Sequence, residues 1–377
     1  MQETTVVQKL RESYSFIDLI YGTHNIYKLA ELVFAMFAAK NYAAHHPVKK
    51  NGKYKIKHSM LVDSWKDTDK IVEDLPDERK YSFKASVNIT YGCDNFCSYC
   101  IVPYVRGREK SRRPQDILRE IEKLAQDGVK EVMLLGQNVN SYGKGLDLAV
   151  SFPELLEEVC RVDGIERVRF MTSHPKDLSD DLIRVIADNK KVARHLHLPL
   201  QSGSNQILAR MNRHYTKEAY LSLVKKIREA VPDLALTTDL IVGFPGETEE
   251  DFQATLQLLK DVRYDMAYTF IYSKRSGTPA ATMDDQIPEE VKRVRLQTLM
   301  DVQNEISYEL NKPMEGQVFD IIVEGPSPRD EDMWFGRTSG NKMVLFPKDD
   351  SLSIGETVPA YIDKAQTWVC YGTIQKG

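Results

Sequence analysis

The feature that most constrains the fold is a regular alternation of two kinds of segment from Ser82 onward. Short runs rich in β-branched and apolar residues, such as KASVNITY and KEVMLLGQN, are each followed by a segment with the apolar periodicity of an amphipathic helix. The pattern occurs six times before Pro313. Strands that alternate with helices form a parallel sheet, and six units are two short of a complete eight-fold barrel. The sequence therefore predicts an α/β domain with a partial (β/α)6 barrel.

The character of the sequence changes after Pro313. Short alternating runs divided by Gly, Pro and Asp, among them GQVFDIIVEG and KMVLFP, predict a small β-barrel. The beginning of the chain has the pattern of a helical or α/β remnant, and a polar stretch follows it. The predicted divisions are a remnant at 1–42, a linker at 43–80, the main domain at 81–313 and the small barrel at 314–377.

Composition excludes several classes of protein. The net charge is -4, so a polyanionic partner would have to meet a local basic patch. The longest apolar run, at 29–40, contains a glutamate and is too short to cross a membrane. The opening residues lack the apolar core of a signal peptide. Five cysteines, three of them clustered, suit a reducing compartment. We expect a cytoplasmic protein without a membrane partner.

The clustered cysteines follow the first predicted strand of the main domain. Cys93, Cys97 and Cys100 have the spacing C-x3-C-x2-C. A structural zinc site needs four ligands, and the remaining Cys160 and Cys370 lie in helical and strand patterns typical of core residues. A catalytic zinc would need an H-x-E partner motif, which is missing. Three thiolates suit a [4Fe–4S] cluster in which one iron stays open for a ligand that the protein does not supply.

This loop, with Tyr99 just before its last cysteine, resembles the radical S-adenosylmethionine superfamily. Further segments, among them LLGQNVNSYG, HLHLPLQSGSNQILARMNRHYT and DLIVGFPGETEEDF, resemble the methylthiotransferases, most closely the tRNA-2-methylthio-dimethylallyladenosine synthases of the MiaB type. The resemblance implies a [4Fe–4S] cluster on the three cysteines and S-adenosylmethionine on its open iron. It also implies methylthiolation of carbon 2 of dimethylallyl-adenosine next to the tRNA anticodon. The C-terminal barrel resembles the TRAM domain, an OB-like RNA-binding module.

Residues at the strand ends are candidates for holding the cofactor, because active sites of such barrels lie there. Gln, Asn and Ser at strand ends have the alternative role of helix caps, and the glycine that of a turn residue. The candidates are Tyr99, Gln137, Asn138, Ser173, His174, Gln201, Ser202, Arg213 and Gly243. His195 and His197 share one face of a strand and are either lumen residues or functional ones.

Two basic segments could contact RNA phosphates. One is RGREKSRR at 106–113, beside the cysteines, and the other is KKNGKYKIK in the expected linker. Trp334, Phe335 and Trp368 of the small barrel either stack on bases or belong to its core. The expected partners are the tRNA anticodon loop and an electron donor such as flavodoxin, and the chain is expected to be a monomer.

One departure from the family concerns the N-terminal domain, which in its members carries three more cysteines for a second cluster. This sequence has no cysteine before Cys93, so it resembles a fragment that begins within that domain. Alternative hypotheses are a half-active RNA-binding fragment, a threonylcarbamoyl-adenosine tRNA methylthiotransferase, a ribosomal-protein aspartate methylthiotransferase and a zinc-dependent RNA deaminase.

Overall fold

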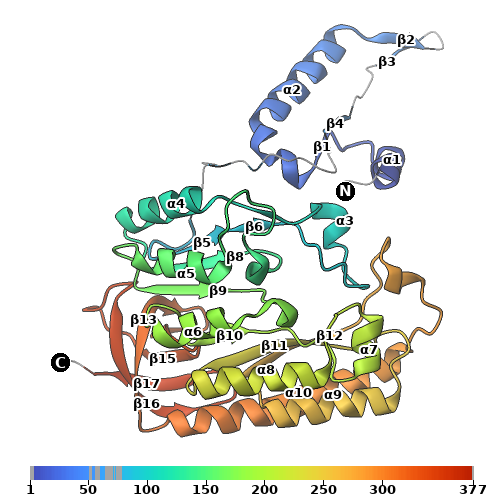
Figure 1. Ribbon diagram of the computed structural model, residues 1–377. Coiled ribbons are helices and arrows are strands. Elements are labelled where there is room, and N and C mark those ends of the chain that lie inside the picture. Colours follow the sequence, from blue (N-terminus) through green and yellow to red (C-terminus); the bar gives the residue numbers. More distant parts are fainter. Residues whose placement is uncertain are drawn as a thin grey trace. The chain divides into compact units, whose positions relative to one another are not determined.

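The computed structural model describes residues 4–50, 53–55, 60–63, 71, 73 and 79–375. The chain divides into two compact units. The first consists of Met1–Asp77 with Val102–Arg108, and the second of Glu78–Ile101 with Glu109–Gly377. Figure 1 shows the elements of both units along the chain.

The first unit combines helices with short strands. The parallel pair β1–β4 and the antiparallel hairpin β2–β3 are its sheets. Strands therefore occur within 43–80, the segment expected to be a linker. The lysine side chains of KKNGKYKIK lie outside the described residues. The elements are α1 (Thr4–Ser13), β1 (Leu19–Tyr21), η1 (Thr23–Lys28), α2 (Leu29–His45), β2 (Val48–Lys50), β3 (Lys53–Lys55), β4 (Leu61–Asp63) and α3 (Val102–Arg106).

The second unit begins with the alternating strands and helices that the sequence predicts. Its elements up to the last long helix are β5 (Lys84–Asn88), β6 (Thr90–Tyr91), β7 (Lys110–Ser111), α4 (Pro114–Gln126), β8 (Glu131–Leu135), η2 (Val139–Ser141), α5 (Phe152–Arg161), β9 (Arg167–Phe170), η3 (Pro175–Asp177), α6 (Asp180–Asp188), β10 (His195–His197), α7 (Asn205–Arg210), α8 (Lys217–Ala230), β11 (Ala235–Val242), α9 (Glu249–Val262), β12 (Met266–Ile271), η4 (Pro279–Thr282) and α10 (Glu289–Asn311).

Six of these strands form the partial barrel. They lie in two parallel sheets, β5–β8–β9 and β10–β11–β12. A parallel bridge between Val168 of β9 and Val192, just before β10, joins the two sheets. The helices lie on the outside of the strands, with α4 and α5 on one side and α8, α9 and α10 on the other (Figure 1). The prediction of a partial (β/α)6 barrel is confirmed.

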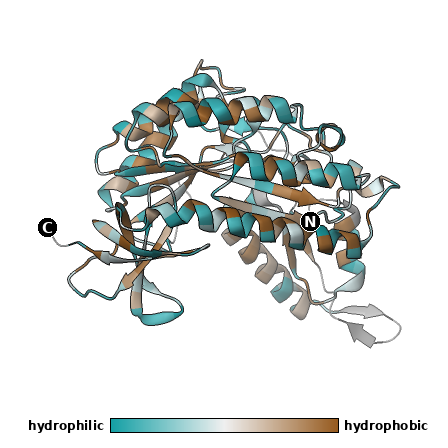
Figure 2. Cartoon of the chain, turned by 90° about the horizontal axis from the view of Figure 1, so that it is seen from below, coloured by the Kyte–Doolittle hydropathy of each residue, from teal (hydrophilic) through white to brown (hydrophobic). Residues whose placement is uncertain are grey.

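The outer helices begin at polar residues that satisfy their free backbone N–H groups. Ser151 with Glu154 starts α5, and Thr248 with Asp251 starts α9, each pair forming a capping box. The helices are amphipathic, so teal and brown residues alternate along them in Figure 2. Their apolar sides pack against the strands in one continuous core that holds the barrel together.

The two faces of the barrel strands differ. Leu240 of β11 belongs to the apolar core beneath the helices, so Thr237 and Asp239, which alternate with it, face the interior of the barrel. We call this interior the lumen. His195 Nε2 and His197 Nδ1 lie 3.1 and 3.0 Å from Thr237 Oγ1. Both histidines of β10 are therefore lumen residues.

The C-terminal segment forms the small barrel that the sequence predicts. Its strands close in the order β13–β14–β15–β17–β16 around a core that includes Ile321, Val344 and Phe346. Trp334 packs against this core, whereas Trp368 is 55% exposed. The elements are η5 (Lys312–Met314), β13 (Val318–Ser327), β14 (Asp330–Thr338), β15 (Met343–Pro347), β16 (Thr357–Ala365) and β17 (Cys370–Ile374).

The loop at 338–342 docks the small barrel on the floor of the partial barrel, where the parallel strands begin. Arg169 donates to the backbone carbonyls of Thr338 and Ser339 at 2.8 and 3.0 Å. Its Nε also lies 3.0 Å from a carboxylate oxygen of Glu131. These groups are buried, so each charge is compensated within the protein.

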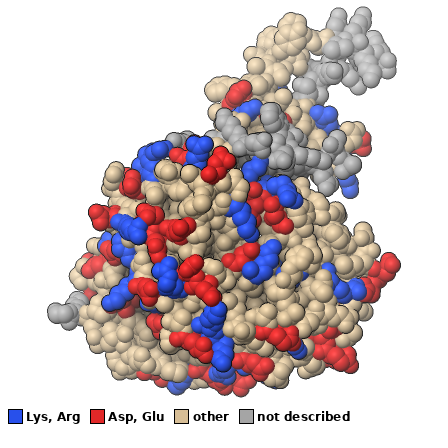
Figure 3. All heavy atoms as spheres, in the orientation of Figure 1, with Lys and Arg blue, Asp and Glu red and all other residues tan. Residues whose placement is uncertain are grey.

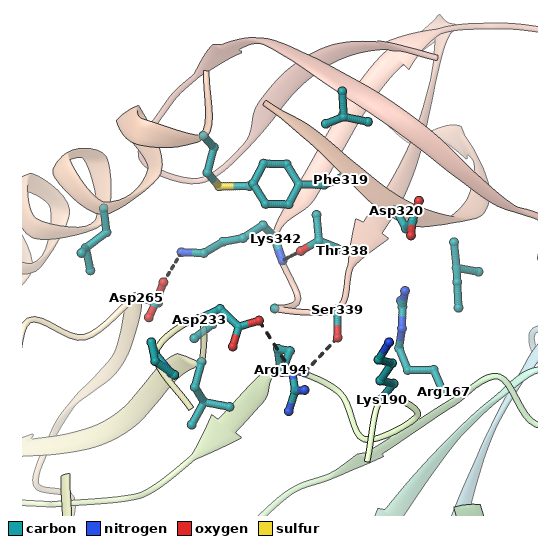
Figure 4. A pocket seen from close by; sticks show the side chains of 18 of the residues that line it. Arg167, Lys190, Arg194, Asp233, Asp265, Phe319, Asp320, Thr338, Ser339 and Lys342 are labelled. Atoms are coloured by element: carbon teal, nitrogen blue, oxygen red, sulfur yellow. Dashed lines mark hydrogen bonds and ion pairs between the residues drawn. The ribbon is translucent and has the colours of Figure 1, made fainter. Parts of the chain in front are cut away.

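A crevice of about 880 Å³ runs along this junction. Figure 4 shows that charged side chains of both signs line it, with Arg194 near Asp233 and Lys342 paired to Asp265. Positive and negative charges are also interspersed over the face seen in Figure 3. Among the described residues, no helix has the length and apolar character needed to span a membrane.

Candidate active site at the mouth of the partial barrel

The cysteine loop, residues 92–101, lies at the mouth of the partial barrel, where the parallel strands end. The segment after α7 fixes its shape. Ser98 donates through its N–H to Met211 O at 3.0 Å and through its Oγ to Arg210 O at 2.7 Å. The Asn212 amide donates to two further loop carbonyls at 3.3 and 2.9 Å. These contacts hold the loop against the end of α7 and the residues that follow it.

The three thiols of the loop differ in exposure. Cys97 is buried, and Cys93 and Cys100 are partly exposed. Burial raises the pKa of Cys93 to about 11, with smaller contributions from the other two thiols. The free thiol is therefore protonated at neutral pH and would release its proton on binding a metal.

The donor set fits a cluster better than a single ion. In the described part of the chain, no three Cys, His, Asp or Glu side chains converge as ligands of one metal ion would. In a [4Fe–4S] cluster the three thiolates lie farther apart than around one ion, because each binds a different iron atom. Arg213 Nη1 lies 3.3 Å from Cys97 Sγ, so a buried positive charge faces the thiol that would become anionic.

Arg213 is expected from the sequence to contact the cofactor, and the structure places its side chain against the cysteine loop. It is 4% exposed. Besides Cys97, its guanidinium donates to Pro199 O and to the Tyr215 hydroxyl, both at 3.0 Å. Burial alone would lower the pKa of Arg213, but Tyr99, Tyr215 and Cys97 raise it, so the guanidinium stays charged.

Tyr99 packs into a small apolar cluster beneath the loop. The cluster contains Met211, Phe244 and Tyr272, with Ile241 at its edge. Burial raises the pKa of the Tyr99 hydroxyl, which therefore stays protonated. The aromatic ring serves to connect the cysteine loop to the end of β11.

Several polar atoms at the strand ends have no partner. A buried polar group without a hydrogen bond costs about 1–3 kcal/mol, so a group of them indicates a missing ligand. They follow β5, β8, β9 and β12. Within the described residues, the unpartnered atoms at these ends are Thr90 Oγ1, Asn138 Oδ1, both polar side-chain atoms of Asn140, Ser173 Oγ, His174 Nε2 and Tyr272 OH.

His174 has a defined protonation state. Burial lowers its pKa to about 2, with further lowering by Arg213 and Lys176, so the ring is neutral. Its Nδ1 accepts from the Lys176 N–H at 3.3 Å. A neutral imidazole that accepts at Nδ1 carries its proton on Nε2. The unpartnered Nε2 is therefore a donor, suited to a carboxylate or another acceptor of the ligand.

Thr90, Asn140 and Tyr272 were not singled out from the sequence. Tyr272 directly follows β12, and Asn140 lies two residues after Asn138. The signal available for them in the sequence was their position after a predicted strand.

The remaining predicted cofactor residues, Gln137, Gln201 and Ser202, differ in burial and in hydrogen bonding. Gln137 is partly buried beside Asn138, and Gln201 is buried with a φ of 74°. Ser202 Oγ lies 3.4 Å from Thr255 Oγ1 and accepts from the Ser204 N–H at 3.2 Å. These contacts give Ser202 a structural role in the turn before α7.

Gly243 occupies a backbone position that favours glycine. Its φ is +70°, and a Cβ there would lie 2.2 Å from Lys292 Cγ. Its N–H donates to Glu247 Oε2 at 2.7 Å. The residue shapes the turn after β11, and its expected place beside the cofactor stays a prediction.

Comparisons with known proteins match two parts of the chain to family models. Residues 87–259 match the Radical SAM superfamily, and residues 312–374 match the TRAM domain. The tRNA-2-methylthio-N(6)-dimethylallyladenosine synthase of Lachnoclostridium phytofermentans is 54% identical over 376 residues, which are 100% of this chain and 78% of the relative. The enzyme of the same name from Acetivibrio thermocellus is 52% identical over 374 residues, 99% of this chain and 74% of the relative.

The chain belongs to the tRNA-2-methylthio-N(6)-dimethylallyladenosine synthase family. It is therefore a radical S-adenosylmethionine methylthiotransferase, with a [4Fe–4S] cluster and S-adenosylmethionine as cofactors. This supports the main hypothesis over the sister methylthiotransferases and the zinc deaminase. Among solved structures, coproporphyrinogen III oxidase from Escherichia coli is 14% identical with a TM-score of 0.45, covering 70% of this chain and 67% of that one.

The basic segment of this methylthiotransferase is only partly available for RNA. Arg106, Arg108 and Arg113 are exposed. Arg112 is 5% exposed, donates to the Asn88 carbonyl at 2.7 Å and pairs with Glu120 at 2.7 Å. The expectation that Arg112 joins an RNA-binding patch is wrong, because its charge is used inside the protein.

Replacing His174 with alanine is expected to weaken S-adenosylmethionine binding about tenfold, because it removes a buried donor from the ligand site. Equilibrium dialysis of labelled cofactor against the reconstituted enzyme measures this. The exposed His214 is the matched control, and His214→Ala should bind normally. Unchanged affinity in His174→Ala would show that His174 does not face the cofactor.

Proposed function

We propose that this enzyme adds a methylthio group to carbon 2 of N6-dimethylallyladenosine in tRNA, with Cys93, Cys97 and Cys100 as the cluster ligands. The observation that carries the proposal is 54% identity over the whole chain to a synthase of that name. The cysteine loop at the barrel mouth and the unpartnered polar atoms beside it support it.

Cys93, Cys97 and Cys100 would hold the cluster, which would supply the electron for reductive cleavage of S-adenosylmethionine. The protein's residues prepare the site for this chemistry. Arg213 holds Cys97 and keeps a positive charge beside its sulfur. His174 offers an Nε2–H donor, and Asn138 and Ser173 offer further polar atoms to the methionine and ribose groups of the cofactor.

Recognition of tRNA is proposed for the TRAM domain together with exposed basic residues such as Arg113. Trp368 is 55% exposed, so its ring is available to stack on an unpaired base. Chemistry on carbon 2 of adenine requires a base that is out of the helical stack, as in an anticodon loop. A tRNA substrate agrees with the expected cytoplasmic location. The electron donor, such as flavodoxin, and the monomeric state stay predictions.

The test uses anaerobically reconstituted protein and tRNA from cells that contain dimethylallyl-adenosine but no methylthio product. Protein, S-adenosylmethionine, dithionite and sulfide are incubated with this tRNA, and the nucleosides are identified by mass spectrometry. We expect dimethylallyl-adenosine to be converted to its 2-methylthio form. Conversion of threonylcarbamoyl-adenosine instead would overturn the proposal in favour of a sister enzyme.

A further inference from the structure

Two large aromatic side chains of β12 are left uncovered. Tyr268 is 41% exposed and Phe270 is 50% exposed, although they lie in a strand of the barrel wall. Ala267, which precedes Tyr268, and Ile271, which follows Phe270, pack in the core beneath the helices. Alternation along the strand therefore turns Tyr268 and Phe270 toward the lumen. We call this pair the aromatic wall.

The pairing of β11 with β12 independently places the wall in the lumen. Asp239 is the partner of Tyr268, and Ile241 is the partner of Phe270. Paired residues in a sheet point to the same face, and Asp239 lies on the lumen face. The ring of His197, a lumen residue, also meets Tyr268 edge-on with centroids 5.7 Å apart.

The wall lies next to the region where the chemistry occurs. Ile241, the strand partner of Phe270, packs at the edge of the same apolar cluster as Tyr99 of the cysteine loop. A ligand that covers Phe270 is therefore separated from the cysteine loop by the width of this cluster. That location suits the molecule on which the radical acts.

A fixed acceptor lies at the inner end of the wall. Asp239 Oδ1 is 3.4 Å from His197 Nε2, and His197 Nδ1 is 3.0 Å from Thr237 Oγ1. His197 and Thr237 are buried, but the Asp239 side chain is 27% exposed. The carboxylate is thus oriented from behind and open to the lumen in front, where its remaining lone pairs can accept a hydrogen bond.

We propose that Tyr268, Phe270 and Asp239 hold the target nucleotide and select it by its N6 substituent. This inference rests on the proposed function. The aromatic wall packs against the flat base and its five-carbon dimethylallyl group, which need apolar partners. Asp239 accepts from the single N–H that the substituted N6 retains. An unmodified adenine would leave the wall partly uncovered.

The test measures binding of two anticodon stem-loop RNAs that differ only in dimethylallyl-adenosine or adenosine at the target position. The full chain should bind the modified RNA at least about tenfold more tightly, as burial of several carbons implies. Phe270→Ala and Tyr268→Ala should reduce this preference to within about twofold, because they weaken binding of the modified RNA more than binding of the unmodified RNA. Asp239→Asn should weaken both RNAs alike, since both carry an N6–H.

Tyr308 on the outside of α10, 43% exposed, is the matched control, and Tyr308→Ala should keep the full preference. Thermal unfolding of each variant shows whether it is folded. If both Phe270→Ala and Tyr268→Ala kept the preference for the modified RNA, the inference would be overturned. If they kept that preference but lost affinity for S-adenosylmethionine, the wall would be assigned to the cofactor instead. Neither result would contradict the proposed function, which is tested separately by detection of the 2-methylthio nucleoside.

Discussion

Replacing Cys97 with alanine is expected to abolish cluster binding. The chain should hold about four irons after anaerobic reconstitution, one cluster's worth, and the variant fewer than about one. Cys97 is the buried thiol of the loop and faces the guanidinium of Arg213. Its loss leaves two partly exposed thiols, which cannot hold three irons of a cluster. Iron and sulfide analysis, with a 5′-deoxyadenosine assay after dithionite and S-adenosylmethionine, measures the effect.

Cys160 provides the control for this experiment. It lies in α5, outside the cysteine loop, and its side chain is buried in the core. Burial raises the pKa of its thiol to about 11. Cys160→Ala should therefore keep its iron and its cofactor cleavage, with only a small loss of stability. If Cys97→Ala retained four irons and formed 5′-deoxyadenosine, the assignment of the cluster ligands would be wrong.

Replacing Arg295 with methionine is expected to destabilise the fold by about 3–5 kcal/mol, since it leaves a buried carboxylate uncompensated. Arg295 Nη1 lies 2.8 Å from Glu247 Oε2, and the two side chains are 8% and 1% exposed. Glu247 also accepts from the N–H of Gly243, so the pair supports the turn at the end of β11. Chemical denaturation followed by circular dichroism measures the free energy of unfolding.

The loss of folding stability caused by Arg295→Met should depend on pH. Burial raises the pKa of Glu247 even in the presence of Arg295, so removing the arginine raises it further. A carboxyl whose pKa is raised on folding favours the folded state at low pH and opposes it as pH rises through that pKa. The difference between variant and parent should therefore be smaller at about pH 5.5 than at about pH 8. Arg293→Met, at an exposed position of α10, should change stability little at either pH. Equal penalties in the two variants would contradict the role given to the buried pair.

The order of the elements could be predicted because periodicity is a local property. The sequence predicts six strand–helix units and a small barrel. The C-x3-C-x2-C spacing of the cysteine loop favours a [4Fe–4S] cluster. Side-chain surroundings are not local. Arg112 belongs to a basic run, yet its partners Asn88 and Glu120 come from neighbouring elements and bury its charge.

Long-range contacts explain the other differences. Arg213 meets Cys97 across 116 positions of sequence, so its place against the loop follows from the fold of the barrel and not from the spacing of residues. The rings of Tyr268 and Phe270 belong to a β-rich run, and the sequence alone does not show that they are exposed. The packing of Ala267 and Ile271 against the core and the register with β11 show that they face the lumen.

The docking of the small barrel has a consequence for biosynthesis. Arg169 is compensated by carbonyls at Thr338 and Ser339, and Lys84 of β5 pairs with Glu324 at 2.6 Å, 240 positions further along the chain. The charges at the barrel floor are therefore without these partners until the last part of the chain has left the ribosome. Docking at the barrel floor is expected to be a late folding event, because contacts of such sequence separation form slowly.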